Sequence, residues 1–310
     1  MVGAMRTVLL ALSLVPVPSL ALAGPGFDDA QIRVGMSTVL SGPAAGLGQE
    51  MKRGVEMYFA ATNAAGGVHG RKLELLALDD GYEPSRTAPN MRTLIDEKDV
   101  FAVLGNVGTP TAVVAAPIAQ ERKVPFFGAL TGASILRRTP PDRYIINFRA
   151  SYDQEMKAMV DGLVDELGVP PERIAFFTQN DAYGDAGFSG AKKALVARGY
   201  DEIVRNVHGR YQRNTVNVED GLARILDARV EPMAVIMVGT YKANAKFIRL
   251  ARREQFRGVF LNLSFVGAEA FAQELDGAGD GMVVRTGHSS DKVREAVRAE
   301  LELPFINHPI

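Results

Sequence analysis

The sequence predicts an α/β fold of two doubly wound lobes, each built on a parallel sheet and joined by a hinge. Short apolar runs alternate with amphipathic helical stretches along the chain. The runs are apolar throughout, which is typical of strands buried on both faces of a sheet. They form two series, separated around residues 143–153. Strands with helices between them form right-handed βαβ units, so two series predict two lobes.

The expected elements follow in chain order. The first series begins with a strand at residues 31–40 and a helix at 49–64. Its other elements are a strand at 72–80, a helix that Ser85 caps and that runs to about Lys98, a strand at 100–105, a helix at Thr109–Arg122 and a strand at 124–129. The second series has helices at 151–167, 187–198, 217–228 and 241–254 and strands at 173–179, 202–208, 234–239 and 259–264. Ligands of open sheets bind beyond the carboxyl ends of the strands, so the crevice between the lobes is the expected site.

Composition excludes several classes of function. The 310 residues are 47% hydrophobic, enough for one large core or two medium ones. The formal net charge is −1 without a basic block, which argues against nucleic acid and against a charged membrane surface as partners. The chain has no cysteine, which excludes disulfides, thiolate chemistry and cysteine-ligated metals.

The first residues predict a secretory signal peptide at residues 1–23. Arg6 precedes an apolar stretch from Val8 to Leu20, and Ala21-Leu22-Ala23 supplies the small residues of a cleavage site before Gly24. A membrane anchor is the alternative, but the run is short and contains two prolines. An exported chain without disulfides suits a bacterial periplasm.

The stretch VLGNVGTPTAVVAAPIAQ (residues 103–120) has the layout of an anion-holding loop at a helix N-terminus. We expect Thr109 to cap the helix and to offer its hydroxyl and a free N–H group to a carboxylate, with Asn106 and Gly108 beside it. The alternative is that Thr109 only caps its own helix. The P-loop and G-x-G-x-x-G patterns are absent from the sequence, which argues against a nucleotide phosphate.

Other candidate contacts also follow predicted strands. The loop at residues 40–48 is rich in Gly and Pro, and the loop at 128–134 places Thr131 among small residues. The alternative for the 40–48 loop is an ordinary turn. Tyr183 and Tyr241 could close over a half-apolar ligand, and the alternative for them is local packing at the helix starts.

The sequence predicts no catalytic residue, no metal site and no cofactor. The four histidines lack metal-ligand spacing, and Ser264 is not in a G-x-S-x-G motif. Asp79 and Asp80 are expected to accept hydrogen bonds from the following turn rather than to bind a metal.

Five stretches match a known family in its own order. They are IRVGMSTVLSGPAAGLGQEMKRGVEMYFAATNAAGG, VLGNVGTPTAVVAAPIAQERKVPFFGALTGAS, FRASYDQEM, QNDAYGDAG and VGTYKANAKFIRLAR, within about residues 30–284. Through them the chain resembles the periplasmic leucine/isoleucine/valine-binding proteins of ABC transporters, which have the type I periplasmic binding fold. The resemblance implies that the loops of Thr109 and Leu130–Gly132 hold the α-carboxylate of an amino acid. The full set of expected ligand contacts is Ser41, Leu47, Asn106, Gly108, Thr109, Leu130, Thr131, Gly132, Tyr152, Tyr183, Tyr241 and Ser264.

Two features depart from the family. Ser264 stands where branched-chain binders carry an acidic residue that pairs with the ligand ammonium, and Leu47 stands where they can carry an aromatic residue. A neutral hydroxyl does not replace a charge-assisted hydrogen bond. An amide, a urea-like compound or an aromatic or short carboxylate therefore fits at least as well as an aliphatic amino acid. After Val284 the sequence also loses the family's closing pattern, which predicts a truncated or frameshifted product with exposed apolar surface on the first lobe.

The expected function is that of a periplasmic solute-binding component of an ABC importer. Residues 24–147 and 285–310 are expected to form the first lobe and residues 148–284 the second, with a hinge near Asn147–Arg149. The expected partners are a small-molecule ligand and inner-membrane permease subunits, without nucleic acid and without membrane insertion. An exported ligand sensor of the same fold is the alternative, and an α/β enzyme is disfavoured because nucleophile, metal and cofactor patterns are missing from the sequence.

Overall fold

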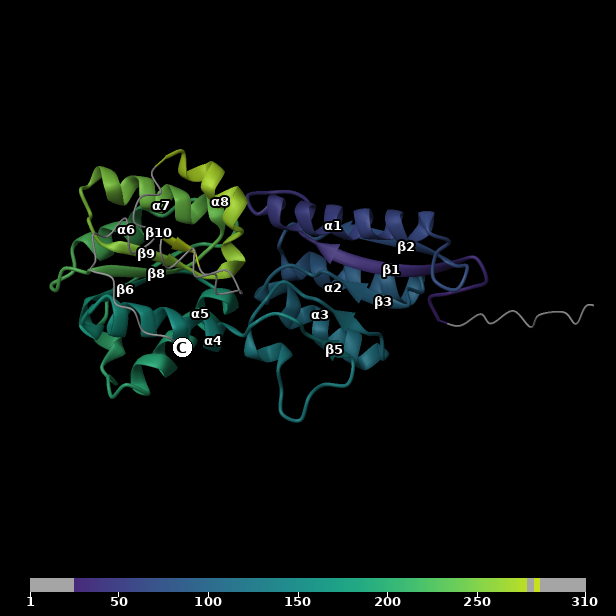
Figure 1. The fold of residues 1–310 in the computed structure, drawn as a ribbon, viewed down its shortest axis with the longest axis horizontal. Coiled ribbons are helices and arrows are strands. Elements are labelled where there is room, and N and C mark those ends of the chain that lie inside the picture. The colour runs from purple at the N-terminus through teal and green to yellow at the C-terminus, as the bar shows by residue number, and fades with distance from the viewer. Residues whose placement is uncertain (1–24, 278–281, 285–310) are drawn as a thin grey trace, which may run out of the picture.

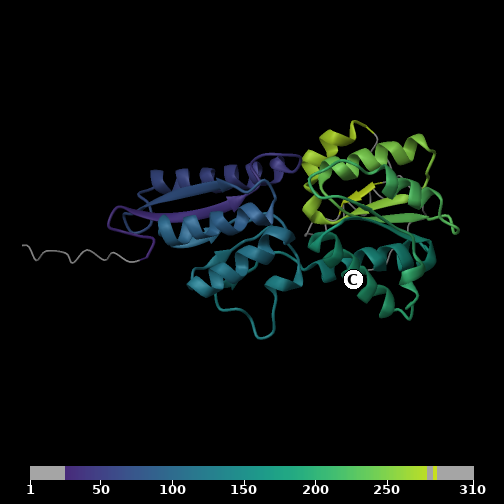
Figure 2. The ribbon, with the colours of Figure 1, turned by 180° about the vertical axis from the view of Figure 1, so that it is seen from behind.

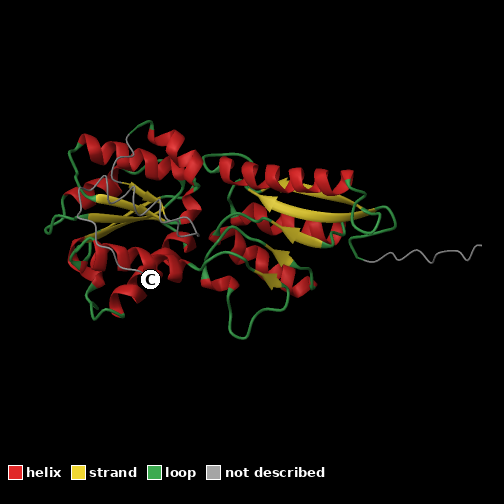
Figure 3. Ribbon diagram, in the orientation of Figure 1, coloured by secondary structure: helices red, strands yellow, loops and turns green. Residues whose placement is uncertain are grey.

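The computed structural model describes residues 25–277 and 282–284 and shows two lobes side by side along its long axis (Figure 1). Each lobe is a five-stranded parallel sheet with helices on both faces (Figure 3). The predicted α/β class with two doubly wound parallel sheets is confirmed. The predicted signal peptide (1–23) and the expected closing segment (285–310) lie outside the described residues.

The first sheet precedes the crossing between the lobes. Its strands are β1 (Gln31–Thr38), β2 (Lys72–Asp79), β3 (Ala102–Leu104), β4 (Phe126–Phe127) and β5 (Ile145–Ile146), in the order β2-β1-β3-β4-β5. Helix α1 (Ala45–Ala64) lies on one face, and α2 (Pro84–Arg92) and α3 (Thr109–Arg122) lie on the other (Figure 1). A π-helical turn, Thr93–Glu97, continues α2.

The second sheet follows the crossing. Its strands are β6 (Ile174–Gln179), β7 (His208–Tyr211), β8 (Ala234–Val238), β9 (Val259–Asn262) and β10 (Met282–Val284), in the order β10-β9-β8-β6-β7. Its helices are α4 (Tyr152–Asp161), α5 (Ala182–Val196), α6 (Glu219–Leu226), α7 (Tyr241–Arg253) and α8 (Ala268–Leu275). Helices α4 and α5 cover one face, and α6, α7 and α8 cover the other, as the view from behind also shows (Figure 2).

The two sheets have the same strand order. Counted from its own first strand, each sheet reads 2-1-3-4-5, so the winding direction reverses between its first and third strands. In each lobe, the helix after the first strand passes very close to that strand. A Cβ atom on Gly48 would lie 2.0 Å from the Val39 carbonyl oxygen, and one on Gly184 would lie 1.9 Å from the Gln179 carbonyl oxygen. Only glycine permits this approach, which fixes the position of the loops at both reversal points.

The core of the second lobe continues into the first lobe. Strands β6 and β8 are buried along their whole length. The same cluster of buried side chains includes Val39, Leu47, Tyr82 and Val107 from the first lobe, whereas a separate cluster lies beneath α3. The lobes are therefore closed against each other.

Some predicted boundaries are wrong. Helix α5 begins at Ala182 rather than at 187, because the Asp181 carboxylate accepts a hydrogen bond from Tyr183 N at 2.9 Å and caps the helix there. The strand expected at 202–208 is replaced by a 3₁₀ turn at Ile203–Arg205 followed by β7, and Val204 in that turn is 84% exposed. Ser85 does not cap α2, because Pro84 already occupies the first helical position.

Large apolar side chains are exposed on the first lobe. They include Met57 and Tyr58 on α1, and Phe127, Ile146 and Phe148 at and after the β4–β5 end of the sheet. The rings of Phe127 and Phe148 stack with centroids 6.2 Å apart. The second lobe also exposes apolar side chains, among them Val204 and Val230, so the truncated product expected from the sequence stays a prediction.

Candidate functional site

The candidate site lies where the carboxyl ends of the two sheets meet. Thr109 and Thr131 follow β3 and β4 in the first lobe, and Tyr183 and Ser264 follow β6 and β9 in the second. Tyr152 begins α4, directly after the chain crosses between the lobes. The strand ends thus supply polar side chains from both lobes to one place.

Thr109 and Thr131 form a buried pair of hydroxyl groups. Their Oγ1 atoms lie 2.7 Å apart, and Thr131 Oγ1 also accepts a hydrogen bond from Ala133 N at 3.2 Å. The prediction that Thr109 caps α3 is wrong. Gly108 is the N-cap residue, with φ of 99°, and Thr109 is the first helical residue, so its hydroxyl turns to Thr131 instead.

Two glycines bring these loops close to tyrosine rings. A Cβ atom on Gly108 would lie 2.1 Å from Tyr82 Cε2, and one on Gly132 would lie 2.5 Å from Tyr152 Cδ1. Tyr152 N also donates a hydrogen bond to the Gly132 carbonyl oxygen at 2.8 Å. The predicted loop residues Gly108 and Gly132 therefore set the positions of two rings.

Tyr152 and Tyr183 are buried, and their hydroxyl groups have no hydrogen-bond partner among the described residues. Their ring centroids are 5.6 Å apart, and Tyr183 packs on Phe265 at 4.5 Å. Burial raises the pKa of Tyr152, although Arg149 and the hydroxyls of Thr131 and Thr109 act in the opposite direction. Burial and the neighbouring tyrosines raise the pKa of Tyr183 well above its usual value. Both phenols are therefore protonated at neutral pH and can donate or accept a hydrogen bond.

Ser264 contacts a buried carboxylate that the sequence analysis did not identify. Its backbone N–H donates to Glu155 Oε2 at 3.0 Å, and its hydroxyl accepts a hydrogen bond from Arg149 Nη2. Arg149 Nη2 also lies 3.5 Å from Glu155 Oε1 in an ion pair, with side chains only 13% and 2% exposed. An acid is thus present beside Ser264, but it comes from α4 and is paired with an arginine.

A signal for Glu155 was present in the sequence. Tyr152, Met156 and Met159 form the buried stripe of α4 at helical spacing, and Glu155 falls on that stripe. A charged residue on the apolar face of a helix is uncommon unless it is paired or functional.

The other predicted contacts are placed as follows. Ser41 is exposed, and its hydroxyl donates to Asp79 Oδ2 at 2.6 Å. Asn106 is buried and donates to the Ser37 carbonyl oxygen, and Leu130 N donates to the Asn106 carbonyl oxygen at 2.7 Å. These two residues hold the β3 and β4 loops in place. Asp79 also accepts from the backbone of Leu40 and Gly81, which confirms its predicted role in the turn.

Leu47 and Tyr241 contact the opposite lobe. The Tyr241 hydroxyl accepts a hydrogen bond from Gly46 N at 3.2 Å. Leu47 is buried, and a Cβ atom on Gly267 of the second lobe would lie 2.7 Å from its Cδ2. These contacts close one side of the crevice.

A group of polar contacts between the lobes, which we call the interlobe clasp, consists of Glu83, Arg213 and Asn214. Arg213 Nη2 lies 2.7 Å from Glu83 Oε2, and Asn214 Nδ2 donates to Glu83 Oε1 at 2.6 Å and to the Gly81 carbonyl oxygen at 2.9 Å. Gln179 Nε2 donates to the Tyr82 hydroxyl at 3.2 Å and adds a further bond across the boundary. The clasp stabilises the closed arrangement.

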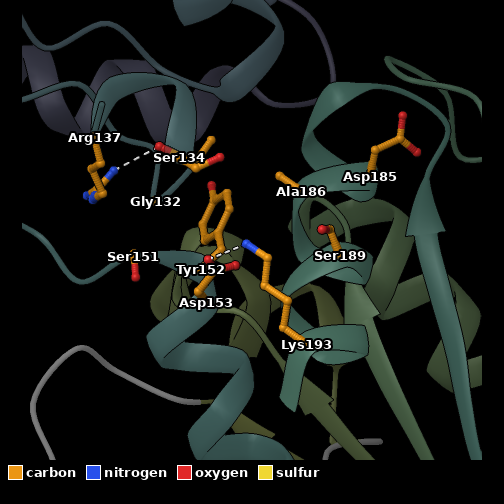
Figure 4. Close-up of a pocket in the computed structure, with 11 residues that line it drawn as sticks. Gly132, Ser134, Arg137, Ser151, Tyr152, Asp153, Asp185, Ala186, Ser189 and Lys193 are labelled. Atoms are coloured by element: carbon orange, nitrogen blue, oxygen red, sulfur yellow. Dashed lines mark hydrogen bonds and ion pairs between the residues drawn. The ribbon is translucent and has the colours of Figure 1, made fainter. Parts of the chain in front are cut away.

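A pocket of about 420 Å³ lies beside Tyr152, between the loop at 132–137 and helices α4 and α5. Figure 4 shows the Tyr152 ring pointing toward the loop of Gly132 and Ser134. Lys193 Nζ pairs with Asp153 Oδ2 at 2.6 Å beside it, and both side chains are exposed. Of the predicted ligand contacts, Thr109, Tyr183 and Tyr241 are not among the described residues that line this pocket.

Within residues 25–277 and 282–284, no helix combines the length and the apolar character that a membrane crossing requires. In the same residues, no group of three or more His, Asp or Glu side chains is arranged to hold a metal ion.

Comparisons with known proteins agree with the geometry. A family model described as periplasmic binding protein matches residues 31–300. The chain is 26% identical over 230 residues to Leu/Ile/Val-binding protein homolog 7 of Brucella suis biovar 1 (strain 1330), and the match covers 72% of this chain and 56% of that protein. The chain therefore spans little more than half the length of such curated relatives.

Two solved structures are similar over most of the chain. A possible leucine/isoleucine/valine-binding protein from Rhodopirellula baltica SH 1 has a TM-score of 0.80 and 48% sequence identity, covering 92% of this chain and 78% of that one. A substrate-binding periplasmic protein from Ralstonia solanacearum has a TM-score of 0.76 and 26% identity, covering 89% and 79%.

Proposed function

The chain belongs to the periplasmic binding protein family, and from this premise we propose that it is the solute-binding component of an ABC importer. It captures an amino acid or a related small carboxylate or amide between its lobes and delivers it to a permease. The names of the similar proteins from Brucella suis and Rhodopirellula baltica support a ligand of this kind. The proposal includes export by cleavage after residue 23, a first lobe of residues 24–147 and 285–310, and a second lobe of residues 148–284.

One observation carries the proposal. Twelve buried side-chain polar atoms have no hydrogen-bond partner among the described residues, and four of them belong to side chains at the meeting point of the lobes: Arg149 Nη1, Tyr152 Oη, Glu155 Oε1 and Tyr183 Oη. Buried polar groups in folded proteins are nearly always hydrogen-bonded, and each unmade bond costs about 1–3 kcal/mol. A ligand between the lobes would supply these bonds.

The proposed mechanism is closure around the ligand. The segment between β5 and α4 links the lobes and acts as the hinge, and the ligand contacts both lobes only when they are closed. Binding therefore shifts the population toward the closed form. An affinity near micromolar requires about 8 kcal/mol, which apolar contacts with the rings and hydrogen bonds to the hydroxyl pair can supply.

We propose that the ligand is bound and released without chemical change. The raised pKa values of Tyr152 and Tyr183 keep both phenols protonated, so that they donate hydrogen bonds rather than act as bases. The hydroxyl pair of Thr109 and Thr131 can hold a carboxylate or a carbonyl oxygen in the same way.

The test is a binding screen on the purified protein. Thermal shift over the common amino acids, their amides, ureas and small aromatic acids identifies ligands, and titration calorimetry measures their affinity. We expect Thr109→Ala to weaken a carboxylate or amide ligand by about tenfold, the usual effect of one lost hydrogen bond of about 1–1.5 kcal/mol. Thr62→Ala, half-buried near the end of α1, serves as the matched control. No stabilising compound in the screen, or chemical conversion of a bound one, would contradict the proposal.

A further inference from the structure

The pair of Arg149 and Glu155 is only half satisfied by the protein. Each side chain uses one polar atom on Ser264, since Arg149 Nη2 donates to the hydroxyl and Glu155 Oε2 accepts from the backbone N–H. The second atom of each, Arg149 Nη1 and Glu155 Oε1, is buried without a hydrogen bond to the described residues. Glu155 Oε1 touches Arg149 Nη2 only through the ion pair at 3.5 Å, so the pair presents one unbonded donor beside one acceptor that lacks a hydrogen bond.

These atoms lie near the proposed ligand site. Glu155 follows Tyr152 by one helical turn on the buried face of α4, and Arg149 pairs with Glu155 at 3.5 Å, so both charges lie near the unpartnered Tyr152 phenol. Ser264, which anchors both charges, directly precedes Phe265, and Phe265 packs on the Tyr183 ring at 4.5 Å. The hydroxyl pair of Thr109 and Thr131 belongs to the first lobe, on the loops that follow β3 and β4. A ligand between the lobes would contact the hydroxyl pair with one part and the charged pair with another.

The charges of the pair compensate each other. A carboxylate placed there gains a bond from Arg149 but lies beside the carboxylate of Glu155, and an ammonium group gains a bond to Glu155 but lies beside the guanidinium. An uncharged group with an N–H next to a C=O satisfies both free atoms at once, because its N–H donates to Glu155 Oε1 and its oxygen accepts from Arg149 Nη1.

We propose that Arg149 and Glu155 together form a charge-compensated receptor for one end of the ligand, and that they select a primary amide or urea group over a carboxylate or an ammonium group at that end. The inference rests on the proposed function, because it assumes that a small ligand binds between the lobes. It assigns to this chain a polar receptor on α4 and the hinge in place of a free acid at position 264.

The test compares compounds of one shape and three charges. At pH 7, 3-methylbutanamide, 3-methylbutanoate and 3-methylbutylamine form one set, and 2-phenylacetamide, phenylacetate and 2-phenylethylamine form another. Urea and the common amino acids complete the panel, and titration calorimetry with thermal shift gives the affinities. We expect an amide to bind at least about tenfold more tightly than the acid and the amine of its set, as the loss of one charge-assisted hydrogen bond implies.

Glu155→Gln distinguishes a role in ligand binding from a purely structural role, because only a binding role predicts a change in ligand preference. The substitution keeps the shape but removes the negative charge, so the receptor carries a net positive charge and the preference should change from the amide to the acid. Arg149→Gln should change it toward the amine. Glu172→Gln, an exposed site on the second lobe, removes the same charge and should leave the preference unchanged. If both receptor variants fail to fold, the order of affinities for the amide, the acid and the amine in the unmodified protein still tests the inference.

Three results overturn the inference. They are an acid or amine that binds as tightly as its amide, a Glu155→Gln variant that keeps the original preference, and binding restricted to compounds without an amide or urea group. In each of these cases the proposed function remains intact. If no compound in the whole panel binds, the proposed function fails together with the inference.

Discussion

Gly184→Ala tests whether α5 lies as close to β6 as the structure shows. A Cβ atom at this position would be 1.9 Å from the Gln179 carbonyl oxygen and 2.9 Å from the Gln179 carbonyl carbon, whereas real Cβ atoms essentially never come within 3.0 Å of another atom. The helix and the strand would have to separate by about 1 Å, and the obstacle is backbone rather than a flexible side chain. Overpacking of this kind costs about 1–3 kcal/mol or more. Because the obstacle is backbone, we take the upper end of this range, about 3 kcal/mol. Alanine recovers about 1 kcal/mol of helix propensity, so we expect a net loss of about 2 kcal/mol.

The matched control is Gly162→Ala. Gly162 has helical dihedral angles at the end of α4, and a Cβ atom there would have no neighbour within 4 Å. The same substitution should therefore stabilise the protein by about 0.5–1 kcal/mol. Urea unfolding followed by far-ultraviolet circular dichroism measures both, with the midpoints compared at constant m-value. A Gly184→Ala protein as stable as the unmodified one would refute the close approach, and with it the placement of Tyr183, the residue before it in the chain.

Two further predictions concern closure and pH. Glu83→Gln weakens the interlobe clasp, because it removes the charge that Arg213 contacts at 2.7 Å. We expect the closed form to lose about 1–2 kcal/mol of stability, so that ligand affinity falls about 5- to 30-fold. Small-angle X-ray scattering should show a larger radius of gyration for the ligand-free variant. Glu121→Gln, which breaks an ion pair within the first lobe, is the control, and an equal effect of both would contradict the prediction. Burial and the nearby Arg210 and Arg224 lower the pKa of His208 from 6.5 to about 4. Between these pH values the unfolded chain binds more protons than the folded one. The free energy of unfolding should therefore fall by up to about 3 kcal/mol as the pH decreases through this range. His208→Gln should flatten this part of the stability profile in urea unfolding at several pH values, and an unchanged slope would exclude His208 as its cause.

The sequence predicts the elements of this fold better than their arrangement. Buried parallel strands such as β6 and β8 are apolar throughout, so alternation of strand and helix was sufficient to find them. The strand at 202–208 was misplaced because Ile203 and Val204 resemble a strand in composition, although only Ile203 is buried. The shared order 2-1-3-4-5 depends on which strands pair across the chain, and local sequence patterns do not contain that information.

The candidate site was found only in part for a similar reason. Thr109, Thr131 and Tyr183 follow strands, and the rule that ligands bind beyond the carboxyl ends of parallel strands was enough to select them. The sequence predicts Arg149 only as a hinge residue, and it predicts no role for Glu155. Their pairing through Ser264 joins residues 109 positions apart, which sequence spacing does not predict.

The distribution of satisfied bonds indicates how closure depends on the ligand. Within the first lobe, Thr109 and Thr131 satisfy each other, and within the second, Ser264 satisfies half of the Arg149–Glu155 pair. Among the described residues, neither lobe supplies a partner for the buried Tyr152 and Tyr183 hydroxyls. Closure without a ligand therefore removes these hydroxyls from water and gives them no new hydrogen bond, at a cost of about 1–3 kcal/mol each. The clasp at Glu83 opposes this cost with a few partly buried polar bonds, so the closed form gains most of its stability only when a ligand satisfies the buried groups.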